Sequence, residues 1–167
     1  MLESKGIAGK KDWGKMLPDE SRRRQGPYVV FECFQEIPCN PCEKACPRGA
    51  VGVGKDINAI PVIDYDLCNG CALCVPHCPG VAIFVVDETY MPGYGKVMLP
   101  WEYLPVPEKG EVVTGLARDG TPVCQAEVVE VRRAKAQDRT AVVGLKVPLE
   151  HVNEVRGLKM GGQQHGR

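Results

Sequence analysis

Seven of the nine cysteines lie in two short runs, and each run ends in a Cys-Pro pair. The first run is Cys39, Cys42 and Cys46 followed by Pro47, and the second is Cys68, Cys71, Cys74 and Cys78 followed by Pro79. A cysteine at every third residue of a tight turn lets several thiolates converge on one point. Thiolates at this density, with a proline directly after the last one, are the ligand pattern of cubane iron–sulfur clusters. The chemistry that these residues indicate is therefore the binding of metal clusters by thiolates.

The two runs are copies of one unit. When the sequence is shifted by 32 residues, the first run falls on the last three cysteines of the second run, and Pro47 falls on Pro79. The first cysteine of the second run, Cys68, has no counterpart, because Glu36 stands at the matching position. The nearest thiol upstream of that position is Cys33. The sequence therefore contains an internal duplication with one departure.

On these two motifs, residues 27–87 resemble the bacterial dicluster ferredoxins. The resemblance implies an α+β fold with a pseudo-twofold repeat and two [4Fe–4S] clusters, in which the last cysteine of each motif serves the cluster of the other motif. For one cluster it implies the ligands Cys68, Cys71, Cys74 and Cys46, and for the other it implies Cys39, Cys42 and Cys78 with one further ligand.

The eighth ligand is the point where this sequence departs from that family. The family has a cysteine where this chain has Glu36. We expect Cys33 to supply the missing thiolate, with residues 34–38 forming a wider loop, because these clusters prefer thiolate ligands. Two alternatives stay open: Glu36 as an oxygen ligand, or a three-iron cluster without a ligand at this corner.

Two other uses of paired cysteines fit the sequence less well. Structural zinc takes four ligands per ion, and a C-x2-C-x2-C triplet supplies one ligand too many at one corner. Disulfides would require an exported chain, and residues 1–16 lack the apolar core of a signal peptide. We therefore expect a cytoplasmic protein with metal-binding cysteines. The ninth cysteine, Cys124, lies in a strand-like run and is expected to be a small buried apolar residue.

The composition is that of an ordinary globular protein. Of the 167 residues, 44% are hydrophobic and 25% are charged, and the formal net charge is zero. Two bound clusters with their thiolates would make the protein about four charges more negative. No basic excess points to nucleic acid. The longest apolar run, Val81–Val86, is too short to cross a bilayer, so we expect no transmembrane segment.

Composition and turn signals divide the chain into four segments. We expect an extended arm at 1–26, a dicluster domain at 27–89, a small antiparallel β-barrel or sandwich at 90–157 and a tail at 158–167.

Local patterns predict several elements within these segments. Tyr28–Phe31 is expected to open the dicluster domain as a strand, and Val81–Val86 to close it. Residues 148–156 place apolar side chains on one helical face and predict a closing helix. The arginines at 22–24 are expected to be solvated rather than to pair with an acidic neighbour or a cluster surface.

No nucleophile–base pair and no flavin or nicotinamide motif accompanies the cysteines. The chain is similar to small iron–sulfur subunits of flavin-dependent dehydrogenases, which implies an electron-transfer subunit of a heteromeric oxidoreductase. Its partners would be a flavoprotein or other iron–sulfur subunits, and it would pass single electrons between them. The extra β-rich segment favours a subunit over the main alternative, a free-standing ferredoxin. A third hypothesis, in which the clusters are only structural, lacks the basic patches and aromatic platforms of a nucleic-acid reader.

Overall fold

The computed structural model describes residues 2–137 and 139–161. Its strands are β1 (Tyr28–Phe31), β2 (Val51–Gly52), β3 (Val62–Ile63), β4 (Ile83–Met91), β5 (Tyr94–Trp101), β6 (Val112–Leu116), β7 (Pro122–Arg132), β8 (Ala141–Pro148) and β9 (Gly157–Met160). Its helices are short: α1 (Leu2–Lys5), α2 (Lys10–Trp13), α3 (Glu20–Arg23) and α4 (Pro41–Ala45), with 3-10 turns at Gly14–Met16, Val75–His77, Lys135–Gln137 and Leu149–His151.

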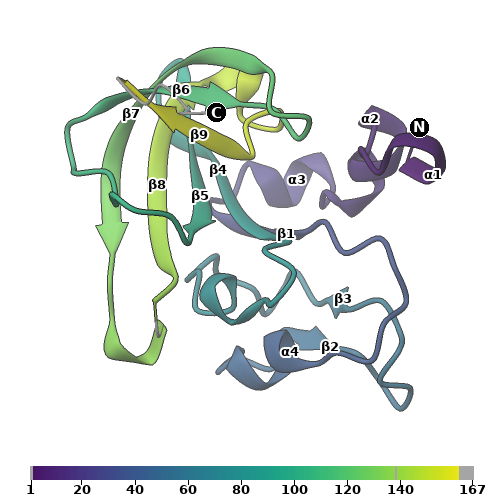
Figure 1. The fold of residues 1–167 in the computed structure, drawn as a ribbon. Coiled ribbons are helices and arrows are strands. Elements are labelled where there is room, and N and C mark those ends of the chain that lie inside the picture. The colour runs from purple at the N-terminus through teal and green to yellow at the C-terminus, as the bar shows by residue number, and fades with distance from the viewer. Residues whose placement is uncertain (1, 138, 162–167) are drawn as a thin grey trace.

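One large sheet dominates the molecule (Figure 1). Seven antiparallel strands lie in the order β1-β4-β5-β8-β7-β6-β9, and β2 pairs with β3 in a small second sheet. The predicted opening strand is confirmed as β1. The predicted closing strand begins two residues later than expected, at Ile83, because Val81 has a φ of +53°, outside the extended region. Tyr28 then pairs with Val86, and Phe31 with Ile83.

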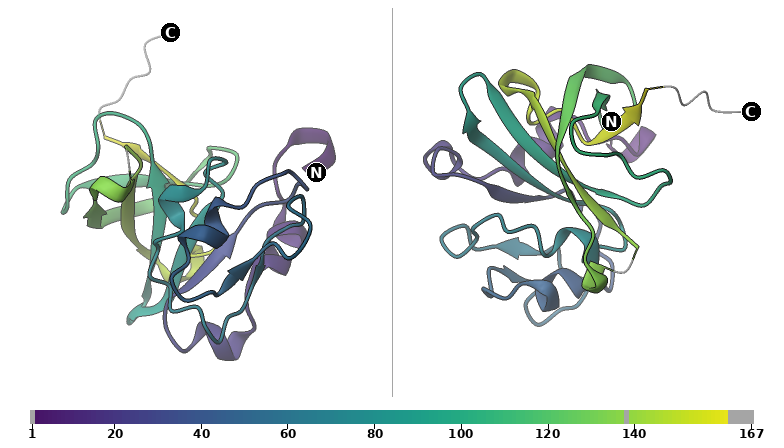
Figure 2. Two further views of the ribbon diagram at one scale, coloured as in Figure 1. Left: turned by 90° about the horizontal axis from the view of Figure 1, so that it is seen from below. Right: turned by 90° about the vertical axis from the view of Figure 1, so that its left-hand side faces the viewer.

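The strands after residue 89 do not form a closed barrel. The sheet order starts at β1 and ends at β9, and no pairing between these two strands closes it within the described residues. The hairpin of β4 and β5 crosses the predicted boundary at 89, so strands from both predicted segments belong to one curved sheet (Figure 2). The division of the chain into independently folding domains stays a prediction.

Strand β1 and the first half of β4, Ile83–Val86, are buried on both faces. Side chains of a strand alternate between its two faces. On one face, Tyr28 and Val30 join the core enclosed by the curled sheet, together with side chains from β5 to β9. On the other face, Val29 and Phe31 pack against the cysteine-bearing segments, as do Ile83 and Val85 of β4. These strands are continuously apolar because both of their faces are buried. The same burial packs the cysteine loops against the sheet.

The N-terminal arm is tied to the rest of the chain by two of its arginines. Arg22 donates hydrogen bonds to the carbonyl oxygens of Tyr65 (3.0 Å) and Cys68 (2.7 Å). Arg23 forms an ion pair with Glu88 at 3.0 Å. The expectation that these arginines are solvated was therefore wrong for Arg22 and Arg23. The short motif carried no signal for their distant partners.

The end of the described chain differs from the prediction in two ways. The predicted helix at 148–156 is only a 3-10 turn at Leu149–His151, although Val152 and Val155 are buried as their spacing indicated. The predicted tail begins inside β9, which pairs with β6, and residues 162–167 lie outside the described part. In the portion of the chain that the structure describes, no helix has the length and apolar character to cross a membrane.

A buried ion-pair group joins three parts of the chain that are far apart in sequence. Glu32, directly after β1, accepts hydrogen bonds from Arg118 Nε at 2.7 Å and from Arg156 Nε at 2.6 Å. The Glu32 side chain is only 7% exposed. Burial alone would raise the pKa of Glu32, but the hydrogen bonds and charges of both arginines outweigh it and lower that pKa.

This group predicts a pH-dependent stability. Because the pKa of Glu32 is lower in the folded state, its contribution is present above the unfolded pKa and is lost as pH falls through the folded pKa. We expect Glu32→Gln to lower the free energy of unfolding by about 3–5 kcal/mol at pH 7, and this difference to shrink below about pH 4. Urea denaturation of both proteins at pH 7 and below about pH 4 measures this difference in the free energy of unfolding. Glu20→Gln, in the exposed pair with Arg24, should change little at either pH. An equal loss for Glu32→Gln at both pH values would contradict the assignment.

Candidate metal centres

Eight of the nine cysteines line two separate cavities, four in each. The first cavity is lined by Cys33, Cys39, Cys42 and Cys78. The second cavity is lined by Cys46, Cys68, Cys71 and Cys74. Each motif therefore lends its last cysteine, Cys46 or Cys78, to the cavity formed mainly by the other motif. These are the two groups of cysteines that the resemblance to dicluster ferredoxins implied, and Cys33 is the fourth cysteine of the first group, as expected. Their role as ligands stays a prediction.

The sheet positions both cavities. Val29 lines the second cavity, and Phe31 lines the first. These two residues stand two positions apart on one face of β1, which places them about 7 Å apart along the strand. The two cavities are therefore neighbours on the outer face of the large sheet.

Both motifs end in the same local geometry. The backbone N–H of Ala50 donates to Cys46 Sγ at 3.3 Å, and that of Ala82 donates to Cys78 Sγ at 3.4 Å. The two contacts are related by the same shift of 32 residues that relates the motifs. The turn after each Cys-Pro pair thus aims a backbone donor at the preceding sulfur, as is common around iron–sulfur ligands.

The thiols are held in surroundings that disfavour their charged form. Burial raises the pKa of Cys42 to about 11 and the pKa of Cys74 to about 12. Burial also raises the pKa of Cys33, with smaller contributions from Cys78 and Cys39. The cysteines that act on each of these thiols belong to its own cavity. Only a bound cation would stabilise four thiolates in such a space.

The donor set distinguishes among metals. Four cysteine sulfurs with apolar neighbours suit iron–sulfur clusters or other thiophilic metals, and do not suit magnesium or calcium. In the described part of the chain, no three His, Cys, Asp or Glu side chains converge closely enough to hold a single metal ion. The residues present fit a [4Fe–4S] cluster in each cavity by their number and chemistry. Glu36 is exposed and is not among the described residues that line the first cavity.

Three arginines fasten the loop of the second cavity. Arg22 donates to the carbonyl oxygen of Cys68 at 2.7 Å, Arg132 to that of Cys71 at 2.7 Å, and Arg48 to that of Leu67 at 2.5 Å. Sequence analysis missed Arg132, which is 61 residues away from its partner and lies at the end of β7. No local pattern marks such a contact.

Comparisons with known proteins match the cysteine-bearing region. The profile of the 4Fe-4S dicluster domain family matches residues 37–82. Pyruvate synthase subunit PorD of Methanothermobacter marburgensis is 32% identical over 76 residues, which cover 42% of this chain and 86% of that protein. The B subunit of the anaerobic dimethyl sulfoxide reductase of Escherichia coli is 33% identical over 88 residues. The match covers 41% of this chain and 42% of that protein.

Other relatives are matched over a smaller part of their length. Ferredoxin-type protein NapF of Haemophilus influenzae is 36% identical over 56 residues, and the match covers 32% of each protein. This chain spans less than two thirds of NapF and of the reductase subunit. No solved structure is a significant match.

Gly70 gives a test of how the second cavity is built. It has a φ of +66°, and an added Cβ would lie 2.6 Å from Pro27 Cβ, immediately before β1. Gly54 has a similar φ of +70°, but an added Cβ there would meet no atom of the described residues within 4 Å. We expect Gly54→Ala to cost about 1 kcal/mol, which corresponds to about 2–4 °C in Tm.

Gly70→Ala carries the same conformational cost and a backbone clash as well. Its Tm should therefore fall at least twice as far as that of Gly54→Ala, and metal should be lost first from the second cavity. Thermal denaturation and iron analysis of both variants measure this. Equal Tm losses would show that the loop does not depend on its contact with Pro27.

Proposed function

The protein belongs to the 4Fe-4S dicluster ferredoxin family, and on that premise we propose that it is an electron-transfer subunit of a heteromeric oxidoreductase. In this proposal it holds two [4Fe–4S] clusters and relays single electrons between a flavoprotein partner and another carrier, in the cytoplasm. The observation that carries the proposal is the sorting of eight cysteines into two neighbouring cavities of four. The relatives named as subunits of pyruvate synthase and dimethyl sulfoxide reductase support a place in a larger complex.

The proposed ligands follow the two cavities. Cys33, Cys39, Cys42 and Cys78 would hold the first cluster, and Cys46, Cys68, Cys71 and Cys74 would hold the second. When bound, each cluster supplies a site that accepts and releases one electron. The equivalent N–H···S contacts of Ala50 and Ala82 support a pseudo-twofold dicluster repeat.

The chain's own residues would hold the clusters close together and make them unequal. Exchange of Cys46 and Cys78 between the motifs ties the two sites to each other. At the second site, three arginine guanidinium groups donate to backbone carbonyls of the loop that carries Cys68 and Cys71. At the first site, the charged residue next to Cys33 is Glu32, which is paired with two arginines. Positive charge near a cluster favours its reduced form. The charged groups around the two sites differ, so we propose that the two clusters differ in potential, which gives the relay a direction.

Variants of the first cavity test the ligand assignment. The chain purified without oxygen should contain about eight irons, and Cys33→Ser should contain about seven with a three-iron signal, or about four if that cluster is lost. Glu36→Ala and Cys124→Ser should keep about eight, since neither residue lines a cysteine cavity. Iron and sulfide analysis with electron paramagnetic resonance (EPR) measures this. Full iron content in Cys33→Ser would refute the assignment of Cys33.

Native purification without oxygen tests the place of the chain in a complex. We expect a flavin-containing protein to co-purify with it at a fixed stoichiometry, and the clusters to be reduced when the substrate of that partner is added. A lone chain that carries both clusters and exchanges electrons quickly with a soluble dye would contradict the subunit assignment. That result would favour a free-standing ferredoxin instead.

A further inference from the structure

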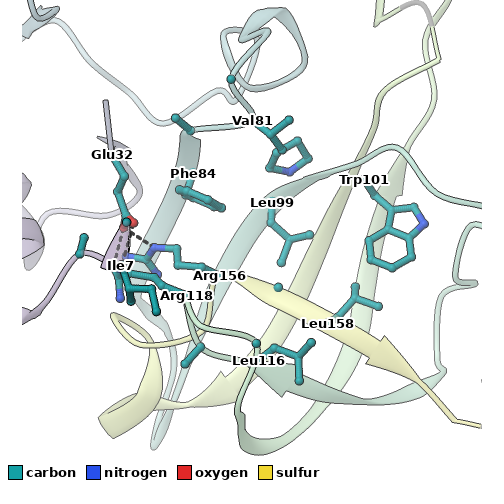
Figure 3. A pocket seen from close by; sticks show the side chains of 18 of the residues that line it. Ile7, Glu32, Val81, Phe84, Leu99, Trp101, Leu116, Arg118, Arg156 and Leu158 are labelled. Carbon is teal, nitrogen blue, oxygen red and sulfur yellow. Dashed lines mark hydrogen bonds and ion pairs between the residues drawn. The ribbon is translucent and has the colours of Figure 1, made fainter. Parts of the chain in front are cut away.

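A third cavity, lined by none of the cysteines, opens at the edge of the curled sheet. Its volume is about 560 Å³, within the range of pockets that bind small molecules. We call it the Arg156 pocket. Its apolar wall consists of Phe84, Leu99, Trp101, Leu116 and Leu158 (Figure 3). These side chains come from β4, β5, β6 and β9 of the large sheet, and Ile7 and Ala8 of the N-terminal arm also line the pocket.

The polar end of the pocket holds more positive than negative charge. Arg118, Arg156 and Glu32 all line it, and Figure 3 shows them gathered at one side of the apolar wall. Their side chains are only 11%, 3% and 7% exposed. Two guanidinium groups thus share a single carboxylate in a place that water hardly reaches. An unbalanced buried charge is costly, so the pocket has the electrostatics of a site for one further anionic group.

Arg156 also keeps an unused donor. Its Nε binds Glu32, and its Nη1 donates to the carbonyl oxygens of Val152 and Val155. Its Nη2 is buried and finds no hydrogen-bond partner in the described parts of the chain. The guanidinium lies over the ring of Phe84, with 5.2 Å between Cζ and the ring centroid. A donor fixed in this way is prepared for a carboxylate oxygen.

We propose that the Arg156 pocket binds a small organic carboxylate with a ring-sized apolar body. The carboxylate would pair with Arg156 and Arg118, and the body would pack against Phe84, Leu99 and Trp101. A single carboxylate matches the one uncompensated charge, and the apolar wall excludes a ligand that is polar throughout. This binding site is an addition to the proposed electron transfer and does not depend on it.

The position of the pocket gives a second readout. Phe34 and the segment 80–82 line it, and they closely follow Cys33 and Cys78 of the first cavity. A bound ligand would therefore press on the backbone that carries two cysteines of the first cavity, while the second cavity shares none of these residues. This second readout rests on the proposed clusters: binding should alter the EPR spectrum of the first cluster and leave that of the second unchanged.

Three probes test the proposal on the full chain purified without oxygen. Phenylacetate has the charge and the ring, phenylacetamide has the ring alone, and acetate has the charge alone. Titration calorimetry should show saturable binding of phenylacetate at one site per protein molecule, at least tenfold tighter than either control. The proposal would be overturned if phenylacetamide or acetate bound as tightly as phenylacetate. It would also be overturned if phenylacetate did not bind.

Two variants locate the site. Arg156→Lys keeps the charge beside Glu32 but removes the forked donor, and should weaken phenylacetate binding at least tenfold. Trp101→Leu removes one aromatic side chain of the apolar wall without touching the ion pairs, and it tests the site if the first variant does not fold. Arg24→Gln, whose arginine lies in an exposed pair with Glu20 and does not line the pocket, is the matched control and should bind phenylacetate normally. Unchanged binding in both pocket variants would refute the site.

Discussion

The structure depends on two paired strand segments, β1 and the first half of β4, that are buried on both faces. One face of β1 and β4 closes the core of the curled sheet, and the other face forms the floor under both cysteine cavities. Each fully buried Val, Ile or Phe contributes about 1.5–3 kcal/mol, so both layers gain from the same short segments. The cysteine loops cannot shift along the sheet without exposing the side chains that support them. This constraint holds the two cysteine cavities at a set spacing without long helices.

The charges around this floor give its two sites different surroundings. Arginines from the arm, from the first motif and from β7 bind the loop of the second cavity, and the arm thereby becomes part of the site. The first cavity instead lies next to the paired group of Glu32 and to the Arg156 pocket. Thiols buried in both cavities have raised pKa values, and a bound cluster would supply the positive charge that stabilises their thiolate forms. An unequal pair of sites suits a directed relay of electrons better than storage.

The sequence predicted the parts of this arrangement that are encoded locally. Cysteine spacing identified both motifs, and the apolar run at 28–31 identified β1, because each lies within one turn or one strand. The joining of later strands to β4 in a single sheet was missed, because the turn signals that suggested a domain boundary are those of the tight β4–β5 hairpin. The contact of Arg132 with the Cys71 carbonyl was missed because the two residues are 61 positions apart. The helical spacing of apolar residues at 148–156 indicated the burial of Val152 and Val155 correctly, but Leu149 is exposed and the segment contains only a 3-10 turn.

The central claim is that one protein molecule holds two neighbouring and unequal [4Fe–4S] clusters on a shared strand floor. A redox titration of the protein purified without oxygen, followed by EPR, tests it most directly. The account predicts two one-electron steps at different potentials, and signals broadened by mutual interaction once both clusters are reduced. A single step from one cluster, or two steps whose signals show no interaction, would contradict it.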